Sequence, residues 1–299
     1  MMIRPAAFDY NSQTATSNRL QVAAIPGAVS AATLALAEFD AAVLALQGAG
    51  VQVCVVADTP LPPKPDAVFP NNWLSWHADG TVVLYPMQAR NRRLERRRDI
   101  LQSVAERCAY RISRVLDLSD FEDQGRYLEG TGSLVLDHVG RQAFACRSSR
   151  TDETLVRYWA DSMGYQPVVF DALDAAGVPF YHTNVMLSIG RRAVVVAAEA
   201  IVAADRERVL GALAAGSRDL IAIDQDAVAG FAGNMLELRS ASGRSVYALS
   251  ARAERSLPAA ARQRLAAATD LLLPIALPTI ERLGGGSVRC MLAEVFSPT

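Results

Sequence analysis

Short apolar segments that alternate with helical segments constrain the fold of this chain most. Strand-like runs are predicted at 51–56, 133–137, 142–146, 168–170, 185–189, 193–197, 220–223, 235–239 and 245–249, with a hairpin at 75–85 around Asp79-Gly80. Helices are predicted at 31–47, 92–110, 152–163, 205–215 and 258–271. Because hairpins are mixed with helices, the pattern disfavours a doubly wound sheet with only β–α alternation.

The length of the chain allows one large domain or two smaller ones. It has 299 residues, of which 51% are hydrophobic and 20% charged, so a sizeable core can form. The sequence contains no long linker and no low-complexity segment. It therefore predicts one integrated domain over residues 1–299, built from several α/β modules of roughly 60 residues if there are five.

Charge and hydropathy disfavour several classes of partner. The net charge of -1 gives no reason to expect nucleic acid or an acidic membrane. The Ala-rich segment 31–57 is interrupted by Glu38 and Asp40, which predicts a buried amphipathic helix and not a membrane span. The N-terminus lacks the apolar region of an export signal, so we expect a cytoplasmic protein.

The spacing of the cysteines disfavours metal binding and disulfides. The four cysteines form no C-x-x-C pair, and no histidine lies next to any of them. A zinc site is therefore not expected, and neither is a disulfide framework in a chain of this size without export. We expect no metal and no organic cofactor, and three of the cysteines should be ordinary core or surface thiols.

One cysteine stands in a context that favours catalysis. Cys290 follows the run Gly284–Gly286, and His182 and Glu129 also lie beside turns or small residues. A thiol, an imidazole and a carboxylate that converge in a fold can perform nucleophilic catalysis by cysteine. Each residue also has a simpler interpretation: Cys290 as core filler, His182 as a structural histidine, and Glu129 as a turn residue.

The order of several motifs resembles a known superfamily. The motifs are the segment 66–72, the E-G-T-G around Glu129, Ser149-Arg150-Thr151, His182-Thr-Asn184, Gly233-Asn234 and Cys290. They are similar to those of guanidino-group-modifying enzymes, which include arginine deiminase, dimethylarginine hydrolase and glycine amidinotransferase. The segments F-P-N-N-W (69–73), Y-P-M (85–87) and N-R-R-L-E-R-R (91–97) are most similar to the citrulline-utilisation hydrolase branch. The resemblance implies an α/β-propeller (pentein) of five modules with pseudo-fivefold symmetry and a central site.

The resemblance also implies roles for individual residues. Cys290 would be the nucleophile, His182 the acid and base, and Glu129 the carboxylate that orients the imidazole. Arg150 would receive the α-carboxylate of an amino-acid substrate, and Asp66 could meet its α-ammonium group. The remaining substrate-binding candidates are Phe69, Asn71, Asn72 and Asn184.

Two of these positions depart from the deiminase pattern. Deiminases carry carboxylates at the positions of Asn72 and Asn184, where the acids hold a cationic guanidinium. An asparagine amide offers both a donor and an acceptor, which suits a neutral ureido group better. The sequence therefore predicts hydrolysis of citrulline to ornithine, ammonia and carbon dioxide. The asparagines 71 and 72 could also form an Asx-turn pair.

Two other functions stay open. The first is a deiminase, methylarginine hydrolase or amidinotransferase that acts on a guanidino substrate. The second is a non-catalytic binding module of the same fold. A homodimer is also left open by the sequence.

Two further segments receive structural predictions. The basic cluster 90–98 is predicted to be a solvated helix face with Glu95 and Asp99 as partners, and an anion site is the less favoured interpretation. The polar stretch 8–21 is predicted to form either part of a substrate lid or a surface strand with its turn.

Overall fold

Four three-stranded sheets with the same topology make up most of the strand content. The computed structural model describes residues 1–23 and 30–296. In each sheet an antiparallel hairpin is followed by a third strand that pairs in parallel with the second strand of the hairpin. The sheets are β3 (Leu74–Trp76), β4 (Thr81–Leu84) and β5 (Arg114–Asp117); β6 (Val135–Asp137), β7 (Gln142–Cys146) and β8 (Gln166–Phe170); β9 (Leu187–Ile189), β10 (Ala193–Val196) and β11 (Asp219–Ala222); β12 (Leu236–Arg239), β13 (Ser245–Ser250) and β14 (Leu271–Ile275).

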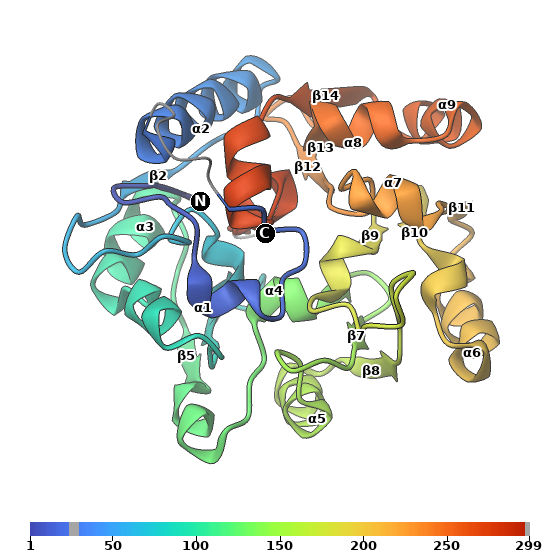
Figure 1. Ribbon diagram of the computed structural model, residues 1–299, viewed down its shortest axis with the longest axis horizontal. Helices are drawn as coiled ribbons and strands as arrows, with labels where there is room; N and C mark the ends of the chain where they lie inside the picture. Colours follow the sequence, from blue (N-terminus) through green and yellow to red (C-terminus); the bar gives the residue numbers. More distant parts are fainter. Residues whose placement is uncertain (24–29, 297–299) are drawn as a thin grey trace.

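A fifth, smaller sheet joins the two ends of the described chain. β1 (Met2–Arg4) pairs in parallel with β2 (Val55–Ala57). On the other side of β1, the backbone of Ala293 donates to Met1 O at 3.1 Å and accepts from Met1 N at 2.8 Å. The described chain thus runs once around a centre and brings the segment at Ala293 back to its first strand (Figure 1).

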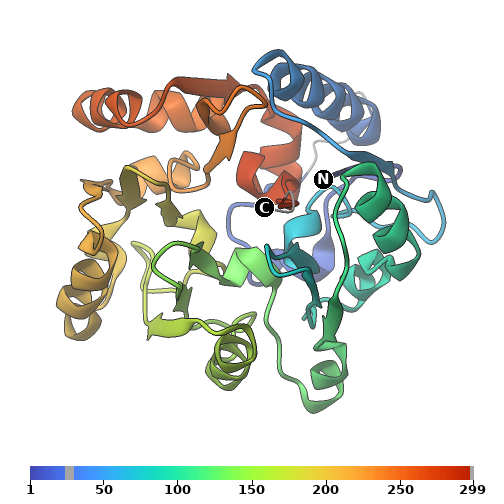
Figure 2. The same ribbon diagram turned by 180° about the vertical axis from the view of Figure 1, so that it is seen from behind.

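The longer helices lie on the outside of this arrangement, with the strands nearer the centre (Figures 1 and 2). They are α2 (Ala31–Gly48), α3 (Leu101–Arg107), α5 (Glu153–Met163), α6 (Ala203–Ala214) and α9 (Ala259–Ala267). Shorter helices are α1 (Ser12–Ala15), α4 (Gly130–Ser133), α7 (Gln225–Ala229) and α8 (Ala251–Ser256). Local sequence explains the ends of α5: the Asp152 carboxylate accepts the Leu155 N–H at 3.0 Å, and Gly164 ends the helix in the left-handed conformation.

The core lies between each sheet and its helices. The face of α2 that is buried carries Ala35, Phe39, Ala42 and Leu46, at spacings of three and four residues, and it packs on β14 and β1. Among the described residues, α2 is the one helix whose length and composition would also suit a membrane span, but a core helix passes the same test. The predicted helix is confirmed over residues 31–48 of the segment 31–57, but its amphipathic character is weak, because Leu34 and Leu44 are exposed.

The basic cluster is the main departure from the predicted elements. The predicted helix over 92–110 is wrong in its first half, where 3₁₀ turns at Arg90–Glu95 and Arg98–Ile100 precede α3. The predicted partners are confirmed, because Glu95 pairs with Arg92 and Asp99 with Arg97, but the predicted solvation is wrong for Arg92 and Glu95, which are each 2% exposed. A buried ion pair of this kind needs a turn that directs both side chains inward, and helical periodicity does not reveal it.

Other differences are smaller. The strands β1, β5 and β14 are not among the predicted ones, and the predicted strands at 133–137 and 185–189 begin with helical turns. The stretch 8–21 contains α1 and turns, so the alternative of a surface strand is wrong.

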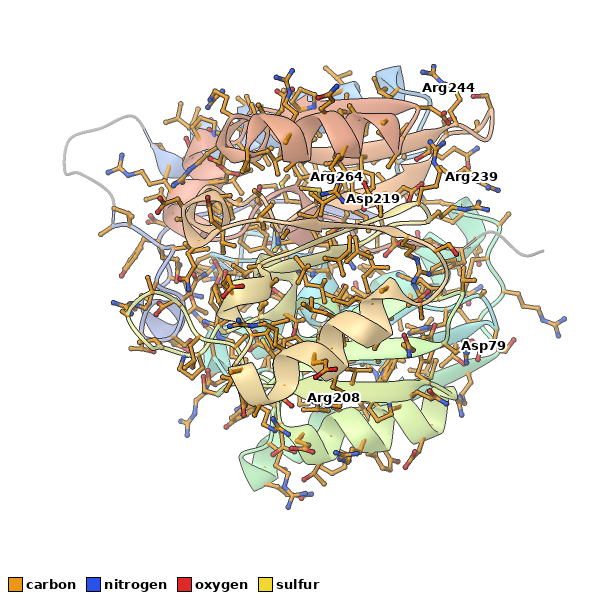
Figure 3. All side chains as sticks on the ribbon, turned by 90° about the vertical axis from the view of Figure 1, so that its right-hand side faces the viewer. Asp79, Arg208, Asp219, Arg239, Arg244 and Arg264 are labelled. Carbon is orange, nitrogen blue, oxygen red and sulfur yellow. The ribbon has the colours of Figure 1, made fainter. Side chains whose placement is uncertain are left out.

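Charged side chains are spread over the outer surface (Figure 3). Arg264 of α9 donates through Nε to Asp219 at the start of β11, at 3.0 Å, and so links two neighbouring sheets. Both side chains are more than two-fifths exposed, so this pair contributes little to stability.

Candidate active site

Short turns that precede the first strand of each hairpin converge at the centre of the molecule. A 3₁₀ turn at Pro70–Asn72 precedes β3, α4 precedes β6, and a 3₁₀ turn at Thr183–Val185 precedes β9. Asn234 lies just before β12, and a 3₁₀ turn at Val288–Met291 comes before the segment that pairs with β1. The repeated topology therefore brings residues from five parts of the sequence to one place.

A buried carboxylate holds the imidazole of His182. Glu129 Oε2 lies 2.8 Å from His182 Nε2 and 3.3 Å from Arg150 Nη1. Burial alone would raise the pKa of Glu129, but Arg150 and the bond to His182 outweigh it and lower that pKa. An ionised carboxylate only accepts, so Nε2 donates, and Nδ1 of the neutral ring carries the free lone pair.

His182 is neutral in this environment. Burial lowers its pKa to about 4, although Glu129 opposes the shift. Its Nδ1 lies against Gly132, where an added Cβ would come within 2.7 Å of Nδ1 and 2.5 Å of Asn72 Nδ2. The imidazole and the Asn72 amide can therefore share this corner only because residue 132 has no side chain.

Two amides surround the thiol of Cys290. Asn234 Nδ2 lies 3.3 Å from Sγ and also donates to the backbone oxygen of Asn184 at 3.0 Å. Asn184 Nδ2 lies 3.7 Å from Sγ. Donors in these positions would stabilise negative charge on the sulfur.

Several buried polar atoms at the site lack a partner. Within residues 1–23 and 30–296, no hydrogen bond reaches Asp66 Oδ1, Asn72 Nδ2 or Asn184 Oδ1. Buried polar atoms are nearly always paired, so such a group of exceptions marks atoms that a ligand can satisfy. Burial also raises the pKa of Asp66, against the lowering effect of Arg92.

The N-terminal segment covers the site. Arg150 donates to the backbone oxygen of Thr14 at 2.9 Å and to Ser17 Oγ at 2.7 Å. Asn11 Nδ2 donates to Asp66 Oδ2 at 2.7 Å, and Asn18 Nδ2 lies 3.2 Å from the carbonyl oxygens of both Gly284 and Gly285. These contacts leave a cavity of only about 10 Å³ beside Cys290.

The glycine run beside Cys290 is shaped by this close packing. Gly285 has φ +61°, and a Cβ there would lie 2.5 Å from Asn18 Nδ2. The hydroxyl of Tyr181 donates to Gly285 O at 2.6 Å, and the guanidinium of Arg150 lies over the Tyr181 ring at 5.1 Å. Side chains on these glycines would push the loop away from the cavity.

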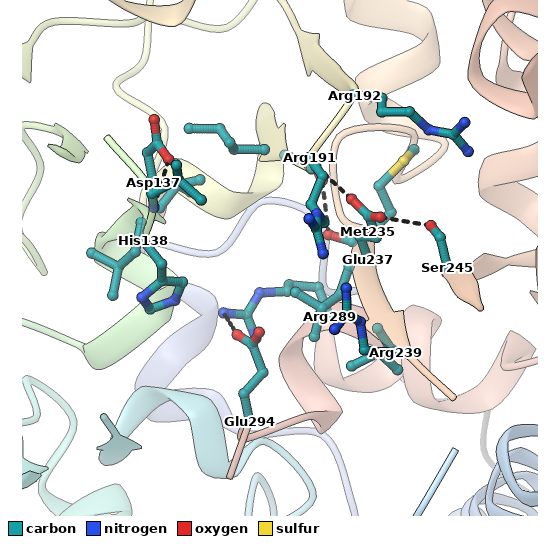
Figure 4. A pocket seen from close by; sticks show the side chains of 18 of the residues that line it. Asp137, His138, Arg191, Arg192, Met235, Glu237, Arg239, Ser245, Arg289 and Glu294 are labelled. Carbon is teal, nitrogen blue, oxygen red and sulfur yellow. Dashed lines mark hydrogen bonds and ion pairs between the residues drawn. The ribbon is translucent and has the colours of Figure 1, made fainter. Parts of the chain in front are cut away.

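A larger cavity of about 570 Å³ lies elsewhere, between β6, β9 and β12 (Figure 4). Its lining includes His138, Arg191, Glu237, Arg239 and Arg289. Neither Cys290 nor His182 lines it. We therefore assign the candidate active site to the small cavity, where the thiol, the imidazole and the unpaired polar atoms meet.

Most of the residues singled out from the sequence lie at this site. The cavity is lined by Asp66, Phe69, Asn72, Arg150, His182 and Cys290. Glu129 and Asn184 stand behind it, in contact with His182 and Cys290. Asn71 is buried without lining the cavity, and within the described chain its side-chain amide finds no partner.

Sequence reasoning missed several residues that the structure places here. Arg92 and Tyr181 line the cavity, and Asn234, which was quoted only as part of a motif, contacts the thiol. Thr14 and Asn18 also line the cavity, but they belong to the stretch 8–21, for which a substrate lid was one of the two predictions. The signal for Arg92 was present in Glu95 three residues later, because a buried arginine needs a nearby acid. In the part of the chain that the structure describes, no group of three or more His, Cys, Asp or Glu side chains is placed so that it could hold a metal ion.

Solved structures with the same fold come from enzymes of arginine chemistry. The N-terminal domain of ArgZ, an arginine dihydrolase from the ornithine–ammonia cycle in cyanobacteria, is 18% identical with a TM-score of 0.75, over 99% of this chain and 97% of that chain. Unliganded AgrE is 20% identical with a TM-score of 0.76, over 100% of this chain and 39% of that chain. A dimethylarginine dimethylaminohydrolase variant in an adduct with S-methyl-L-thiocitrulline is 16% identical with a TM-score of 0.63, over 97% of this chain and 98% of that chain. Identities this low show a shared fold.

The fold and the site together define a member of the guanidino-group-modifying superfamily, a hydrolase that acts on carbon–nitrogen bonds. The family model described as N,N dimethylarginine dimethylhydrolase, eukaryotic, matches residues 4–297, and the chain belongs to this family. No curated protein matches the sequence. The predicted resemblance to the superfamily is confirmed, whereas the citrulline branch within it stays a prediction.

Proposed function

We propose that this protein hydrolyses the ureido group of citrulline to give ornithine, ammonia and carbon dioxide. The observation that carries the proposal is the orientation of the Asn72 amide. Its Oδ1 accepts from Arg92 Nη1 at 2.8 Å, which leaves Nδ2 as the unpaired atom beside the cavity. A guanidinium has only donors, whereas the ureido carbonyl accepts a hydrogen bond.

Asn184 complements this pattern. Its unpaired Oδ1 offers an acceptor close to the thiol, and the N–H groups of a ureido substrate could satisfy it. The Asn72 amide thus offers a donor and the Asn184 amide an acceptor, and a ureido group, which is neutral, has an acceptor and donors to match them. A cationic guanidinium would meet a donor where it needs an acceptor, and a buried mismatch of this kind is costly.

The proposed chemistry begins at Cys290. His182 Nδ1 takes the thiol proton, and the thiolate attacks the ureido carbon with Asn184 and Asn234 beside the sulfur. The protonated imidazole, held by Glu129, then gives its proton to the departing amine. Ornithine leaves, a carbamoyl thioester remains on Cys290, and water activated by His182 releases it as carbamate, which decomposes to ammonia and carbon dioxide.

The amino-acid end of the substrate would be held by two charged residues. Arg150 offers a planar fork for the α-carboxylate once Ser17 and Thr14 release it. Asp66, whose Oδ1 is among the unpaired buried atoms of the described chain, would accept from the α-ammonium group. Phe69 would form an apolar wall of the cavity.

A second candidate is a hydrolase of a guanidino substrate, such as arginine or a methylated arginine. The family match and the arginine chemistry of the structural neighbours favour it. Attack by the same thiol on the guanidinium carbon would expel ammonia from arginine or dimethylamine from dimethylarginine, and water would then release citrulline from the sulfur. A second attack, on the ureido carbon of citrulline, would be needed to give ornithine. Asn72 Nδ2 is the feature that speaks against it.

The arrangement of the sheets supports two structural proposals. Four equivalent sheets and a fifth joined by Ala293 and Met1 fit a pentein propeller with pseudo-fivefold symmetry. The same contacts between the two ends fit one catalytic domain over residues 1–299. The expected partner is a small amino-acid substrate.

Product analysis separates the two functions. Purified protein is incubated with citrulline, arginine and asymmetric dimethylarginine, and ornithine, citrulline, ammonia and dimethylamine are measured. Ornithine and ammonia from citrulline, with no product from the two guanidino substrates, support the proposal. Ornithine from arginine at a comparable rate would indicate a dihydrolase, and accumulated citrulline would indicate a deiminase or methylarginine hydrolase.

A further inference from the structure

We infer that Arg92 is a positioning residue that determines specificity, because it fixes the Asn72 amide with an N–H directed at the substrate. The inference rests on the proposed function and extends it from Asn72 to the residue behind it. The sequence pattern placed Arg92 on a solvated helix face, so its position beside the cavity was unexpected.

The orientation of Asn72 follows from chemistry and not from the assignment of its two amide atoms. An arginine side chain has donors only, so the atom of Asn72 that faces Arg92 Nη1 at 2.8 Å must be the oxygen. Rotation of the amide by 180° would bring two donors together in a buried place. Asn72 Nδ2 therefore points away from Arg92, into the corner that it shares with His182 Nδ1 beside the cavity, as long as Arg92 keeps its position.

Arg92 is held firmly by its other contacts. Its Nε and Nη2 donate to the two carboxylate oxygens of Glu95 at 2.9 and 2.8 Å, and Nη2 lies 3.3 Å from the backbone oxygen of Phe69. Both side chains of the pair are at most 3% exposed. A bidentate pair out of contact with water has little freedom, so the guanidinium is a rigid support for Asn72.

Because Glu95 compensates the charge of Arg92, an effect of hydrogen-bond direction at Asn72 can be distinguished from an effect of charge. The carboxylate compensates the cation of Arg92 within the same turn, so repulsion of a cationic substrate is weakened. Discrimination at Asn72 would then depend on which amide atom faces the reacting group. A residue that merely stabilised the fold would affect both substrates alike.

The test removes the guanidinium that orients Asn72 and leaves the net charge of the buried site unchanged. Arg92→Gln alone would leave Glu95 as an unpaired buried charge, so the variant is Arg92→Gln/Glu95→Gln. A glutamine amide can donate or accept, which lets Asn72 adopt either orientation. We expect kcat/KM for citrulline relative to arginine to fall by about tenfold, the effect of one hydrogen bond.

Two further variants show whether the change in substrate ratio is specific to Arg92. Arg92→Lys keeps a donor-only group opposite Asn72 Oδ1 and should restore most of the citrulline preference. Arg218→Gln/Asp137→Asn removes another buried ion pair, with side chains 8% and 4% exposed, away from the thiol. This control should lower stability without changing the substrate ratio, and thermal unfolding of all variants confirms that they are folded.

Binding gives a second measurement that does not depend on turnover. In the Cys290→Ser background, calorimetry with citrulline and arginine should show the same change in relative affinity when Arg92 and Glu95 are replaced. If wild type prefers citrulline but the ratio stays within about twofold in the double variant, the positioning role is overturned while the proposed function stands. If wild type prefers arginine, the proposed function fails, and the donor role of Asn72 fails with it.

Discussion

Cys290 is the residue on which the proposed chemistry depends most. Its Sγ lies within reach of Asn184 and Asn234, and it lines the cavity together with His182. Cys290→Ser replaces the thiol with a hydroxyl, which is a far weaker acid, so the imidazole of His182 generates much less of the anionic nucleophile. We expect turnover to fall by at least about 10³-fold while thermal unfolding is unchanged.

Cys146 provides a matched control. It is also buried, but burial raises its pKa to about 11, and its sulfur faces Phe180 O and Thr183 instead of the cavity. Cys146→Ser should keep kcat near that of wild type, and mass spectrometry of a quenched reaction should find an adduct on the peptide with Cys290 alone. Full activity of Cys290→Ser would remove this residue as nucleophile.

The pH dependence of kcat/KM reports the state of His182 in the free enzyme. Because burial lowers its pKa to about 4, the imidazole stays neutral, and able to take the thiol proton, well below the usual value of 6.5. We expect activity to fall on the acid side with an apparent pKa between about 4 and 5. An acid limb near 6.5 in a pH–rate profile would show that His182 titrates as an exposed histidine does.

Arg150 tests the proposed contact with the α-carboxylate. Its guanidinium donates to Thr14 O and Ser17 Oγ, so a substrate carboxylate must replace these acceptors. Arg150→Lys keeps the charge but loses the bidentate geometry, and we expect KM to rise by about tenfold or more. Citrulline amide hydrolysed as well as citrulline would contradict this role.

At the scale of elements, the N-terminal segment around α1 covers the small cavity. Its contacts with Asp66, Arg150 and the Gly284–Gly285 backbone leave about 10 Å³, far less than an amino acid needs. We expect the segment 11–21 to open for substrate and to close again over it. In hydrogen exchange of Cys290→Ser, citrulline should change the protection of these amides and leave β7 unaffected.

A rigid site would give a different result. Equal exchange of the segment 11–21 with and without saturating citrulline would mean that substrate enters by another route. Citrulline binding itself, measured by calorimetry on the same protein, serves as the control for saturation.

The sequence predicts elements well where a local signal is strong. The hairpin at 75–85 is marked by Asp79-Gly80, and 142–146 is an apolar run; both are confirmed as β3–β4 and β7. β5 and β14 were missed, because half-exposed third strands such as Arg114–Asp117 carry little alternation. The turns around Arg92 depend on a buried partner from the same segment, which no periodicity encodes.

The site residues illustrate the same limit. Cys290, His182 and Arg150 could be proposed because motif order carried a family resemblance, although their roles stay proposals. Asn234 stood in one of those motifs, but its contact with the thiol depends on the tertiary structure. Asn18 and Tyr181 donate hydrogen bonds to the backbone oxygen of Gly285. Any residue type has such an oxygen, so these contacts cannot be predicted from the sequence.

At the scale of the whole molecule, the site exists only when all parts of the ring are assembled. Glu129, His182, Asn234 and Cys290 precede different strands, and the hydrogen bonds between Met1 and Ala293 join the first part of the chain to the last. The proposed specificity therefore depends on the assembled centre, where Asn72 and Asn184 would face the substrate from the turns that precede β3 and β9. Replacing both amides by acids should make the centre favour a cation.

The most direct test compares kcat/KM for citrulline and arginine in wild type and in Asn72→Asp/Asn184→Asp. Wild type should prefer citrulline by a wide margin, since buried groups left unpaired can give discrimination of roughly 10⁴-fold. In the double variant citrulline hydrolysis should weaken and arginine should bind better, because carboxylates offer no donor to the ureido carbonyl. Wild-type turnover of arginine equal to or faster than that of citrulline would contradict the account.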